Sequence, residues 1–338
     1  MKQPFFSIVI ATYNSEKTIE YTLQSIFSQS VDKSEVEILV VDGGSTDKTL
    51  SIAKNYNVLI FDNPKKLPEY AKAIGMRNAN GHYIIRMDSD EEFSHISQLQ
   101  EKMDFLKKHP DLKMLIPNQI ISGRKNICGI SADYMNILGD PFSYFVYRTK
   151  IDKCETYKKN IIFNDGKYNI MRFKNEDIYP LADSATSLLS LDFIRLKYPE
   201  EYDSVEFTCG AYDRVIQDTE LWGCIKGDNI KHNCSSSFRV YLSKLRFRVI
   251  NNLFHKEESG FSSKEKMNNC LTGRKLLFCL YAVLFPLPIL DSFRLAIVYR
   301  NSTFLLHFIY LYYVCFQIGK GIILKIFGKE IINSSYGQ

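Results

Sequence analysis

Two aspartates one residue apart, Asp88 and Asp90, form the pattern in this sequence that most directly suggests chemistry. They follow residues 82–87, which predict a strand that ends at Asp88. Side chains alternate along an extended backbone, so one carboxylate can face a ribose hydroxyl while the other meets a divalent cation. Mg²⁺ and Mn²⁺ prefer oxygen ligands and commonly link one or two carboxylates to substrate phosphates. The alternative is a pair of solvated loop aspartates or helix caps.

Polar residues also end two earlier strands. The apolar run Ser7–Ala11 is typical of a strand buried on both faces of a parallel sheet, and Glu37–Val41 predicts a second such strand. In these sheets ligands bind beyond the carboxyl ends of the strands, so the three strand ends together predict one binding site. The polar residues that follow the first two strands are Thr12, Tyr13, Asn14 and Asp42.

Helical patterns alternate with these strands through residues 7–115. Asn14 or Ser15 is a candidate cap for the first helix, and Ser45 is one for the second. Alternation of strand and helix with short loops predicts a doubly wound α/β sheet. The remaining expected elements are a helix that ends near Asn55, a strand over Asn57–Phe61 and a helix that begins at Pro68.

The rest of the chain divides into two parts of different composition. Residues 120–215 are rich in Tyr, Asn and Asp, and we interpret them as strands and loops that cover an active site. From residue 238 onward the pattern is helical and basic, with 14 Lys/Arg against 5 Asp/Glu, whereas the preceding 237 residues hold 29 and 33. We therefore expect a nucleotide-binding half over about 1–118, an acceptor or cover half over about 119–237, and a separate basic region over 238–338.

The composition excludes several classes of protein. A hydrophobic content of 45% and a charged content of 24% are ordinary for a globular chain of 338 residues, so disorder and fibrous repeats are excluded. The mean hydropathy of −0.17 argues against a protein with many membrane spans. Residues 1–4 begin no signal peptide, and the eight cysteines show neither a CxxC pair nor a zinc-site spacing. These features predict a cytosolic catalytic part.

Two uncharged stretches in the basic region suggest contact with a membrane. Residues 276–290 would span only about 22 Å as a helix, and Pro286 and Pro288 would break it, so we expect an interfacial or re-entrant segment. Residues 301–319 could just span a bilayer or lie in its interface, with basic residues on anionic headgroups. The alternative is a pair of soluble helices packed on the catalytic domain. Nucleic acid is disfavoured because the basic region carries long apolar runs.

The sequence lacks the motifs that mark two nucleotide-binding folds and one class of polysaccharide synthase. No GxGxxG follows the first strand and no GxxxxGK[ST] occurs, so a dinucleotide dehydrogenase or a P-loop enzyme would lack its phosphate cradle. Trp222 is the only tryptophan, and the QxxRW pattern that marks processive polysaccharide synthases is absent from the sequence.

Four segments, in this order, resemble the family 2 glycosyltransferases of GT-A fold: FSIVIATYNSEKTIEYTLQSIFSQ, EILVVDGGSTDKTL, YIIRMDSDEEF and IQDTELWGCIKG. The resemblance covers roughly residues 5–232. The IIRMD and QDTEL forms are similar to bacterial exopolysaccharide transferases of the succinoglycan type. The resemblance implies an α/β fold of GT-A (nucleotide-diphospho-sugar transferase) type, a Rossmann-like sheet followed here by a helical, membrane-associating region.

The resemblance also implies roles for individual residues. Asp218 would be the catalytic base on the acceptor hydroxyl, and Glu220 would support it, although the usual Glu before the base is Gln217 here. Lys72 stands where the family has an Arg and would contact the diphosphate. The other implied donor contacts are Thr12, Tyr13 and Asn14 around base and ribose, Asp42 on the base, Asp88 on the ribose or sugar, and Asp90 on Mn²⁺ or Mg²⁺ at the diphosphate.

The expected reaction is transfer of one sugar, with inversion, from a nucleotide-diphosphate sugar, most simply a UDP-sugar, to a lipid-linked or glycan acceptor at the cytoplasmic face of the membrane. An in-line displacement needs one base for the acceptor proton, and the metal offsets charge on the leaving diphosphate. Asp218 and Glu220 could instead cap a helix through Leu221 and Trp222. His232 and His255 could complete a metal site, but each is more often a surface or core histidine.

Two other functions remain open at this stage. One is a catalytically silent membrane scaffold with the same fold, against which the intact Asp90 and Asp218 argue. The other is a sugar-phosphate nucleotidyltransferase, which would need a Gly-rich loop with a basic residue near the start of the chain.

Overall fold

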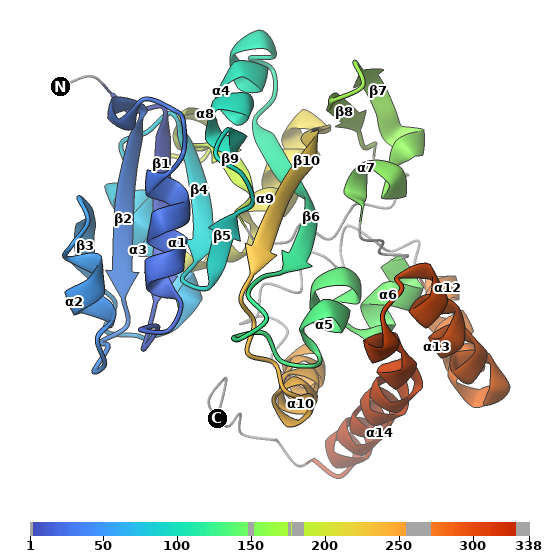
Figure 1. The fold of residues 1–338 in the computed structure, drawn as a ribbon. Helices are drawn as coiled ribbons and strands as arrows, with labels where there is room; N and C mark the ends of the chain where they lie inside the picture. Colours follow the sequence, from blue (N-terminus) through green and yellow to red (C-terminus); the bar gives the residue numbers. More distant parts are fainter. Residues whose placement is uncertain (1–2, 148–151, 175–176, 178–185, 255–271, 329–338) are drawn as a thin grey trace. The chain divides into compact units, whose positions relative to one another are not determined.

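The computed structural model describes residues 3–147, 152–174, 177, 186–254 and 272–328 (Figure 1). The chain forms two compact units. Unit 1 comprises residues 1–123, 152–177 and 182–233, and unit 2 comprises residues 124–151, 178–181 and 234–338. The predicted domain boundary at residue 237 stays a prediction. The described residues of 124–147 pack with the C-terminal helices, although the sequence pattern grouped them with the acceptor half.

A mixed sheet forms the centre of unit 1, in the strand order β3-β2-β1-β4-β9-β6-β10-β8-β7. β1 pairs in parallel with β2 and β4, and β2 pairs in parallel with β3. These four strands confirm the predicted parallel half of the sheet. Their bounds are Phe6–Thr12 for β1, Val36–Asp42 for β2, Leu59–Asp62 for β3 and Tyr83–Asp88 for β4.

The second half of the sheet contains antiparallel strands. β9 lies between β4 and β6 and is antiparallel to both, so β4 and β6 run in the same direction. β10 is parallel to β6, while β8 and the short β5 are antiparallel to β10. The bounds are Glu91–Phe93 for β5, Met114–Ser122 for β6, Ile161–Asn164 for β7, Tyr168–Arg172 for β8, Leu188–Ser190 for β9 and Leu221–His232 for β10.

The helices of the first half begin later than the candidate caps suggested. Neither Asn14 nor Ser15 caps α1 with its side chain, because a turn follows Ser15 and the helix begins at Ile19. Ser45 does not cap α2, because this helix begins only at Thr49. The backbone N–H of Thr49 donates to the Asp47 carboxylate at 2.9 Å. Pro68 does open α3, as predicted. The helices are α1 (Ile19–Phe27), α2 (Thr49–Ala53), α3 (Pro68–Asn78) and α4 (Gln98–Lys108), with a short 3-10 helix over Lys33–Glu35.

Residues 120–215 are more helical than the sequence indicated. The helix α9 ends at Thr219, Glu220 has a left-handed backbone with φ of 55°, and the following residues form β10. The expected helix through Leu221 and Trp222 is therefore a strand, because this segment pairs with β6 on one side and β8 on the other. The helices are α5 (Ala132–Leu138), α6 (Pro141–Tyr147), α7 (Lys153–Thr156), α8 (Leu191–Lys197) and α9 (Val205–Thr219).

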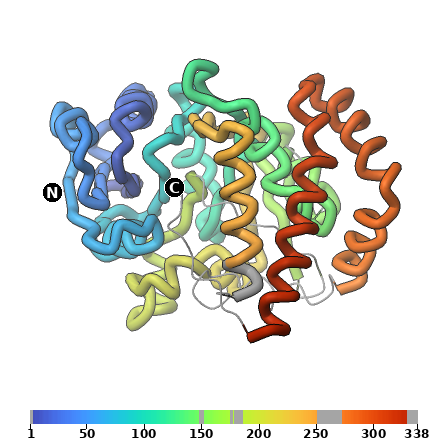
Figure 2. Tube along the Cα trace, turned by 90° about the horizontal axis from the view of Figure 1, so that it is seen from below, coloured from blue at the N-terminus to red at the C-terminus, as the bar shows by residue number. Residues whose placement is uncertain are grey.

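Unit 2 is helical, which confirms the helical pattern after residue 238. Its core gathers aromatic side chains from distant segments, including Tyr134, Tyr241, Phe304 and Tyr310. Figure 2 shows α14 beside α10, and the two helices pack together. The helices are α10 (Phe238–Phe254), α12 (Thr272–Val283), α13 (Pro286–Val298) and α14 (His307–Ile326), with a 3-10 turn over Ser302–Leu306.

One buried ion pair fastens α4 to the sheet of unit 1. The Lys102 ammonium contacts the Asp228 carboxylate, and both side chains are almost completely buried. The Gln98 amide also donates to Asp228 at 2.7 Å. Removing one member of such a pair leaves the other charge buried without compensation, which usually costs about 3–5 kcal/mol.

We expect Lys102→Met to lower the free energy of unfolding of unit 1 by about 3–5 kcal/mol. Urea unfolding followed by Trp222 fluorescence would measure this, because Trp222 is fully buried in unit 1. The control is Arg77→Met, which breaks the exposed Arg77–Asp203 pair and should cost less than about 1 kcal/mol. Equal effects of the two substitutions would contradict this account.

Candidate functional site

The strand register brings the predicted strand ends together. Thr12 lies directly opposite Asp42 on β2, and Ala11 lies opposite Asp88 on β4. We call this side of the sheet, formed by the ends of β1, β2, β4 and β10, the carboxyl edge. The Thr12 hydroxyl is buried there and has no hydrogen-bond partner among the described residues.

Asn14 ties the loop after β1 to the loop after β2. Its backbone is left-handed, with φ of 49°, a conformation that Asn tolerates better than most residues. Its backbone N–H donates to the Ser45 hydroxyl at 2.8 Å, and its side-chain oxygen accepts from the Thr46 backbone N–H at 2.9 Å. Tyr13, beside it, is 46% exposed, and the Lys66 ammonium lies 5.4 Å from its ring centre.

Asp42 shapes the second loop. Its carboxylate accepts backbone hydrogen bonds from Gly44 at 3.0 Å and from Ser45 at 2.8 Å, and it accepts the Ser45 hydroxyl at 2.5 Å. Gly44 has a φ of 84°, which favours glycine at that turn. Both oxygens of Asp42 thus act on their own loop, and the predicted contact to a nucleotide base stays a prediction.

Lys72 neutralises Asp88. The lysine is buried in α3, and its ammonium lies 3.0 Å from a carboxylate oxygen of Asp88. Burial alone would lower the pKa of Lys72, but the attraction of Asp88 outweighs it, so the pKa is raised above its ordinary value. Lys72 therefore carries a positive charge at neutral pH and forms an ion pair with Asp88.

A third acid, Glu91, lies beneath the two aspartates. Its carboxylate accepts the backbone N–H of Asp88 at 3.0 Å. Burial, together with repulsion from Asp88, raises the pKa of Glu91 to about 8. In the same turn the Ser89 hydroxyl lies 2.7 Å from that of Ser15, which links the turn to the loop after β1. With a pKa of about 8, Glu91 is mostly protonated at neutral pH, so it adds little negative charge beside Asp88 and Asp90.

His232 reaches the second aspartate from β10. Its ring Nε2 lies 3.3 Å from a carboxylate oxygen of Asp90, because β10 pairs with β5 so that His232 is opposite Glu91. From the sequence alone, His232 has no assigned role. It reaches the carboxyl edge because β10 runs parallel to β6 and ends there, a pairing that no local pattern in the sequence indicated. His255 lies outside the described residues.

Asp90 and His232 suit a divalent cation as two of its ligands. An oxygen and an imidazole nitrogen fit Mn²⁺ better than Mg²⁺, which strongly prefers oxygen. Within the described part of the chain, no group of three or more His, Cys, Asp or Glu side chains is arranged to hold a metal. Substrate phosphate oxygens and water could supply the other ligands of a bound ion.

Asp218 and Glu220 lie at the opposite edge of the sheet. Asp218 is in the last turn of α9, just before β10 begins beside the start of β6. β10 has 12 residues, so its two ends are roughly 30–35 Å apart. Because β4, β6 and β10 run in the same direction, this distance separates Asp218 from the carboxyl edge.

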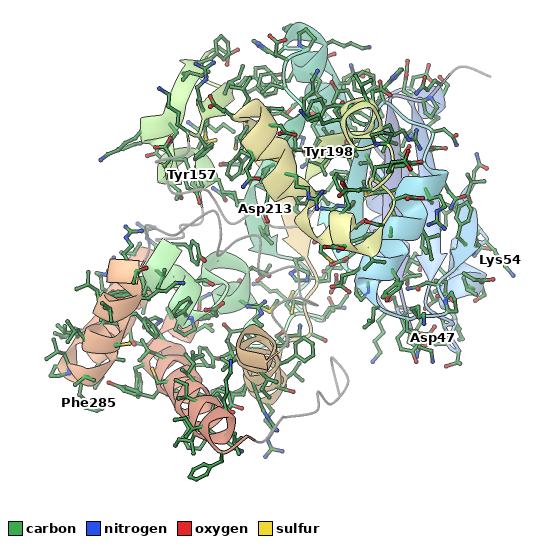
Figure 3. All side chains as sticks on the ribbon, turned by 180° about the vertical axis from the view of Figure 1, so that it is seen from behind. Asp47, Lys54, Tyr157, Tyr198, Asp213 and Phe285 are labelled. Carbon is green, nitrogen blue, oxygen red and sulfur yellow. The ribbon has the colours of Figure 1, made fainter. Side chains whose placement is uncertain are left out.

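The contacts of Asp218 are also local. The Tyr198 hydroxyl, labelled in Figure 3, donates to its carboxylate. Burial and this hydrogen bond raise the pKa of Tyr198 above its ordinary value. The structure therefore does not bring Asp218 and Glu220 together with the other predicted site residues, and their position does not support a role as base and supporting acid.

Comparison with known proteins identifies the class. Residues 7–174 match the model of the family described as Glycosyl transferase family 2, so the chain contains a domain of this family. The solved mannosyltransferase PcManGT from Pyrobaculum calidifontis, in complex with GDP-Man and Mn²⁺, is 12% identical, with a TM-score of 0.54 over 94% of this chain and 88% of that one. This likeness shows a shared fold and confirms the predicted α/β sheet of GT-A type.

Two curated relatives are similar over part of their length. The poly(ribitol-phosphate) beta-N-acetylglucosaminyltransferase TarS from Staphylococcus aureus is 29% identical over 167 residues, which is 47% of this chain and 29% of TarS. The minor teichoic acid biosynthesis protein GgaA from Bacillus subtilis is 31% identical over 121 residues, which is 32% of this chain and 27% of GgaA. The matches thus span less than a third of either relative.

The two-loop arrangement predicts different effects for two substitutions of Asn14. Asn14→Ala removes the bond to Thr46 and places alanine in a left-handed backbone, so we expect UDP affinity to fall by about tenfold. Asn14→Asp keeps an acceptor and the same backbone tolerance, and should stay within about threefold of the natural protein. Calorimetric titration with UDP measures both. Equal affinities for the alanine and aspartate variants would contradict the proposed bridge.

Proposed function

We propose that this chain transfers a sugar from a nucleotide-diphosphate sugar, most simply a UDP-sugar, to an acceptor hydroxyl. The observation that carries this proposal is the placement of Asp90 beside His232, next to the two polar loops that end β1 and β2. The family match and the nucleotide-sugar complex of PcManGT support the same donor class.

Some of the proposed donor-binding residues hold the loops in position, and others interact with the donor through charge. Tyr13 offers an exposed ring for the base, while Asn14 and Asp42 hold the loops that frame it. Lys72 pairs with one carboxylate oxygen of Asp88 and holds it in place, so that the second oxygen can accept a hydrogen bond from the ribose or sugar. Asp90 and His232 would hold Mn²⁺ or Mg²⁺, which when bound would offset charge on the leaving diphosphate.

The proposed transfer inverts the anomeric centre by a single displacement. Such a reaction needs one base at the acceptor hydroxyl and no carboxylate nucleophile. That base must lie at the carboxyl edge, where the donor binds. Asp218 does not meet this condition, because it lies at the far end of β10.

The proposed acceptor is a lipid-linked or glycan hydroxyl in bacterial envelope polysaccharide assembly. The names of TarS and GgaA refer to poly(ribitol-phosphate) and to teichoic acid, and these names support the proposed class of acceptor. We further propose that the C-terminal helices hold the enzyme on the cytoplasmic face of the membrane. Of the described helices, one, Ser302–Ile326, is long and apolar enough to cross a bilayer.

Asp90→Ala should abolish metal-dependent UDP binding and reduce donor hydrolysis by at least about 10²-fold, since a direct ligand is lost. His232→Ala should weaken Mn²⁺ affinity by about 10–100-fold. The control is Asp192→Ala, an aspartate paired with His82 at the opposite edge, which should leave hydrolysis unchanged. Full activity of Asp90→Ala, or undiminished activity in excess EDTA, would exclude this site, and no hydrolysis of any nucleotide sugar would favour a silent scaffold.

Asp218→Asn separates the sequence-based hypothesis from the structure. A catalytic base would lose about 10²–10⁴-fold in turnover, whereas we expect turnover within about threefold of the natural protein. Tyr198→Phe is the matched control, because it removes the same hydrogen bond without changing a carboxylate. A large loss in Asp218→Asn alone, with donor affinity unchanged, would restore Asp218 as the base.

A further inference from the structure

The outward surface of α12 and α13 in unit 2 is strongly apolar. Seven large side chains there are each at least 59% exposed: Leu276, Leu280, Val283, Phe285, Leu290, Ile297 and Val298. Phe285 lies at the turn between the two helices (Figure 3). Soluble monomers rarely expose a contiguous apolar surface that extends over two helices.

Asp291 and Tyr281 of the same helices face inward, whereas Arg294, the partner of Asp291, is 56% exposed. Asp291 accepts hydrogen bonds from the hydroxyls of Tyr144 at 3.0 Å and Tyr281 at 3.1 Å, and it pairs with Arg294 at 2.7 Å. The Tyr281 hydroxyl also lies 3.0 Å from the buried ring of His307. The acid is thus only 16% exposed and is enclosed by donors. In α12 and α13 the apolar side chains face outward and the acid faces inward, which is the reverse of the pattern of a surface helix in water.

We propose that the α12–α13 hairpin inserts into one leaflet of a membrane with anionic headgroups and does not cross it. The two helices have 12 and 13 residues, so each is about 18–20 Å long, against about 30 Å of hydrocarbon. They are bent by 98° at their junction, which returns the chain to the side from which it entered. This deepens the membrane association in the proposed function and specifies its form.

Basic residues flank the hairpin where headgroups would lie. Arg274 and Lys275 are in the first turn of α12, and Arg300 follows α13. Between them the only charged residues are Asp291 and Arg294, which pair with each other. The inserted part therefore brings no unpaired charge into lipid, while its flanks match an anionic surface.

The longer helix α14 stays with unit 2 rather than spanning the bilayer. Tyr310, Leu311 and Val314 on its inner face are buried, and the Tyr310 hydroxyl lies 2.7 Å from that of Ser131. It packs along α10, which carries four basic residues between positions 239 and 248. A helix fastened to so charged a partner cannot be surrounded by lipid along its length.

Depth-dependent fluorescence quenching tests the proposal on the full chain. Phe285→Trp would be mixed with vesicles of brominated phosphatidylcholine and phosphatidylglycerol, with the natural protein as baseline, because its single Trp222 is fully buried. We expect at least twofold quenching of the added tryptophan, strongest for bromines placed shallowly in the acyl chain. Leu196→Trp, at a position 84% exposed in α8, is the control and should not be quenched.

A second variant measures binding without a probe. Leu284→Gln with Phe285→Gln should weaken flotation with these vesicles by about tenfold, while donor hydrolysis in detergent stays unchanged. Strongest quenching by bromines at the bilayer centre would show a span and overturn the one-leaflet proposal. Absence of quenching, whether or not the protein self-associates through this face, would also overturn it. Quenching without donor hydrolysis would leave this proposal standing and contradict the proposed function alone.

Discussion

The parallel pairing of β1 with β2 and β4 is the constraint on which the candidate site depends. This register sets Thr12 beside Asp42 and Ala11 beside Asp88, so the loops that follow these strands meet at one edge although they are far apart in sequence. A slip of one residue in β4 would turn its buried side chains to the other face of the sheet, so burial on both faces fixes the register. The packing of the buried strands thus determines which polar side chains meet at the carboxyl edge.

Two side chains approach the aspartates of the carboxyl edge. Lys72 offsets Asp88 from α3, and His232 approaches Asp90 from β10. Glu91 is a third acid in this turn, and burial together with the charge of Asp88 raises its pKa to about 8. An edge of this kind attracts cations more readily than it tolerates additional anions, which suits a metal-bound diphosphate better than a bare one.

Features that depend on local sequence patterns, such as the buried strands of the parallel half, were predicted correctly. Continuous apolar runs identified β1, β2 and β4, and their polar ends located six candidate donor residues at one edge, whereas Lys72 in α3 came from the family resemblance. The role of Asp218 as base came from the family resemblance and stays a prediction, while the helix weighed through Leu221 and Trp222 is not formed. Pairing with β6 and β8 makes Leu221 the first residue of a strand, so Asp218 lies at the edge opposite the candidate donor residues.

Long-range packing explains what else the sequence could not provide. Residues 132–147 join helices that lie more than a hundred residues later in the chain, through contacts such as Tyr134 with Tyr241 and Tyr310. No periodicity within a segment encodes such a partner. The basic, apolar composition after residue 238 predicts contact with an anionic membrane surface, which stays a prediction.

A crystal structure of the full chain with UDP and Mn²⁺, with the manganese located by anomalous scattering, tests the central claim most directly. The account predicts a manganese peak in contact with Asp90 and His232, and a uracil beside Tyr13. A manganese peak or a nucleotide at the opposite edge, near Asp218, would contradict it.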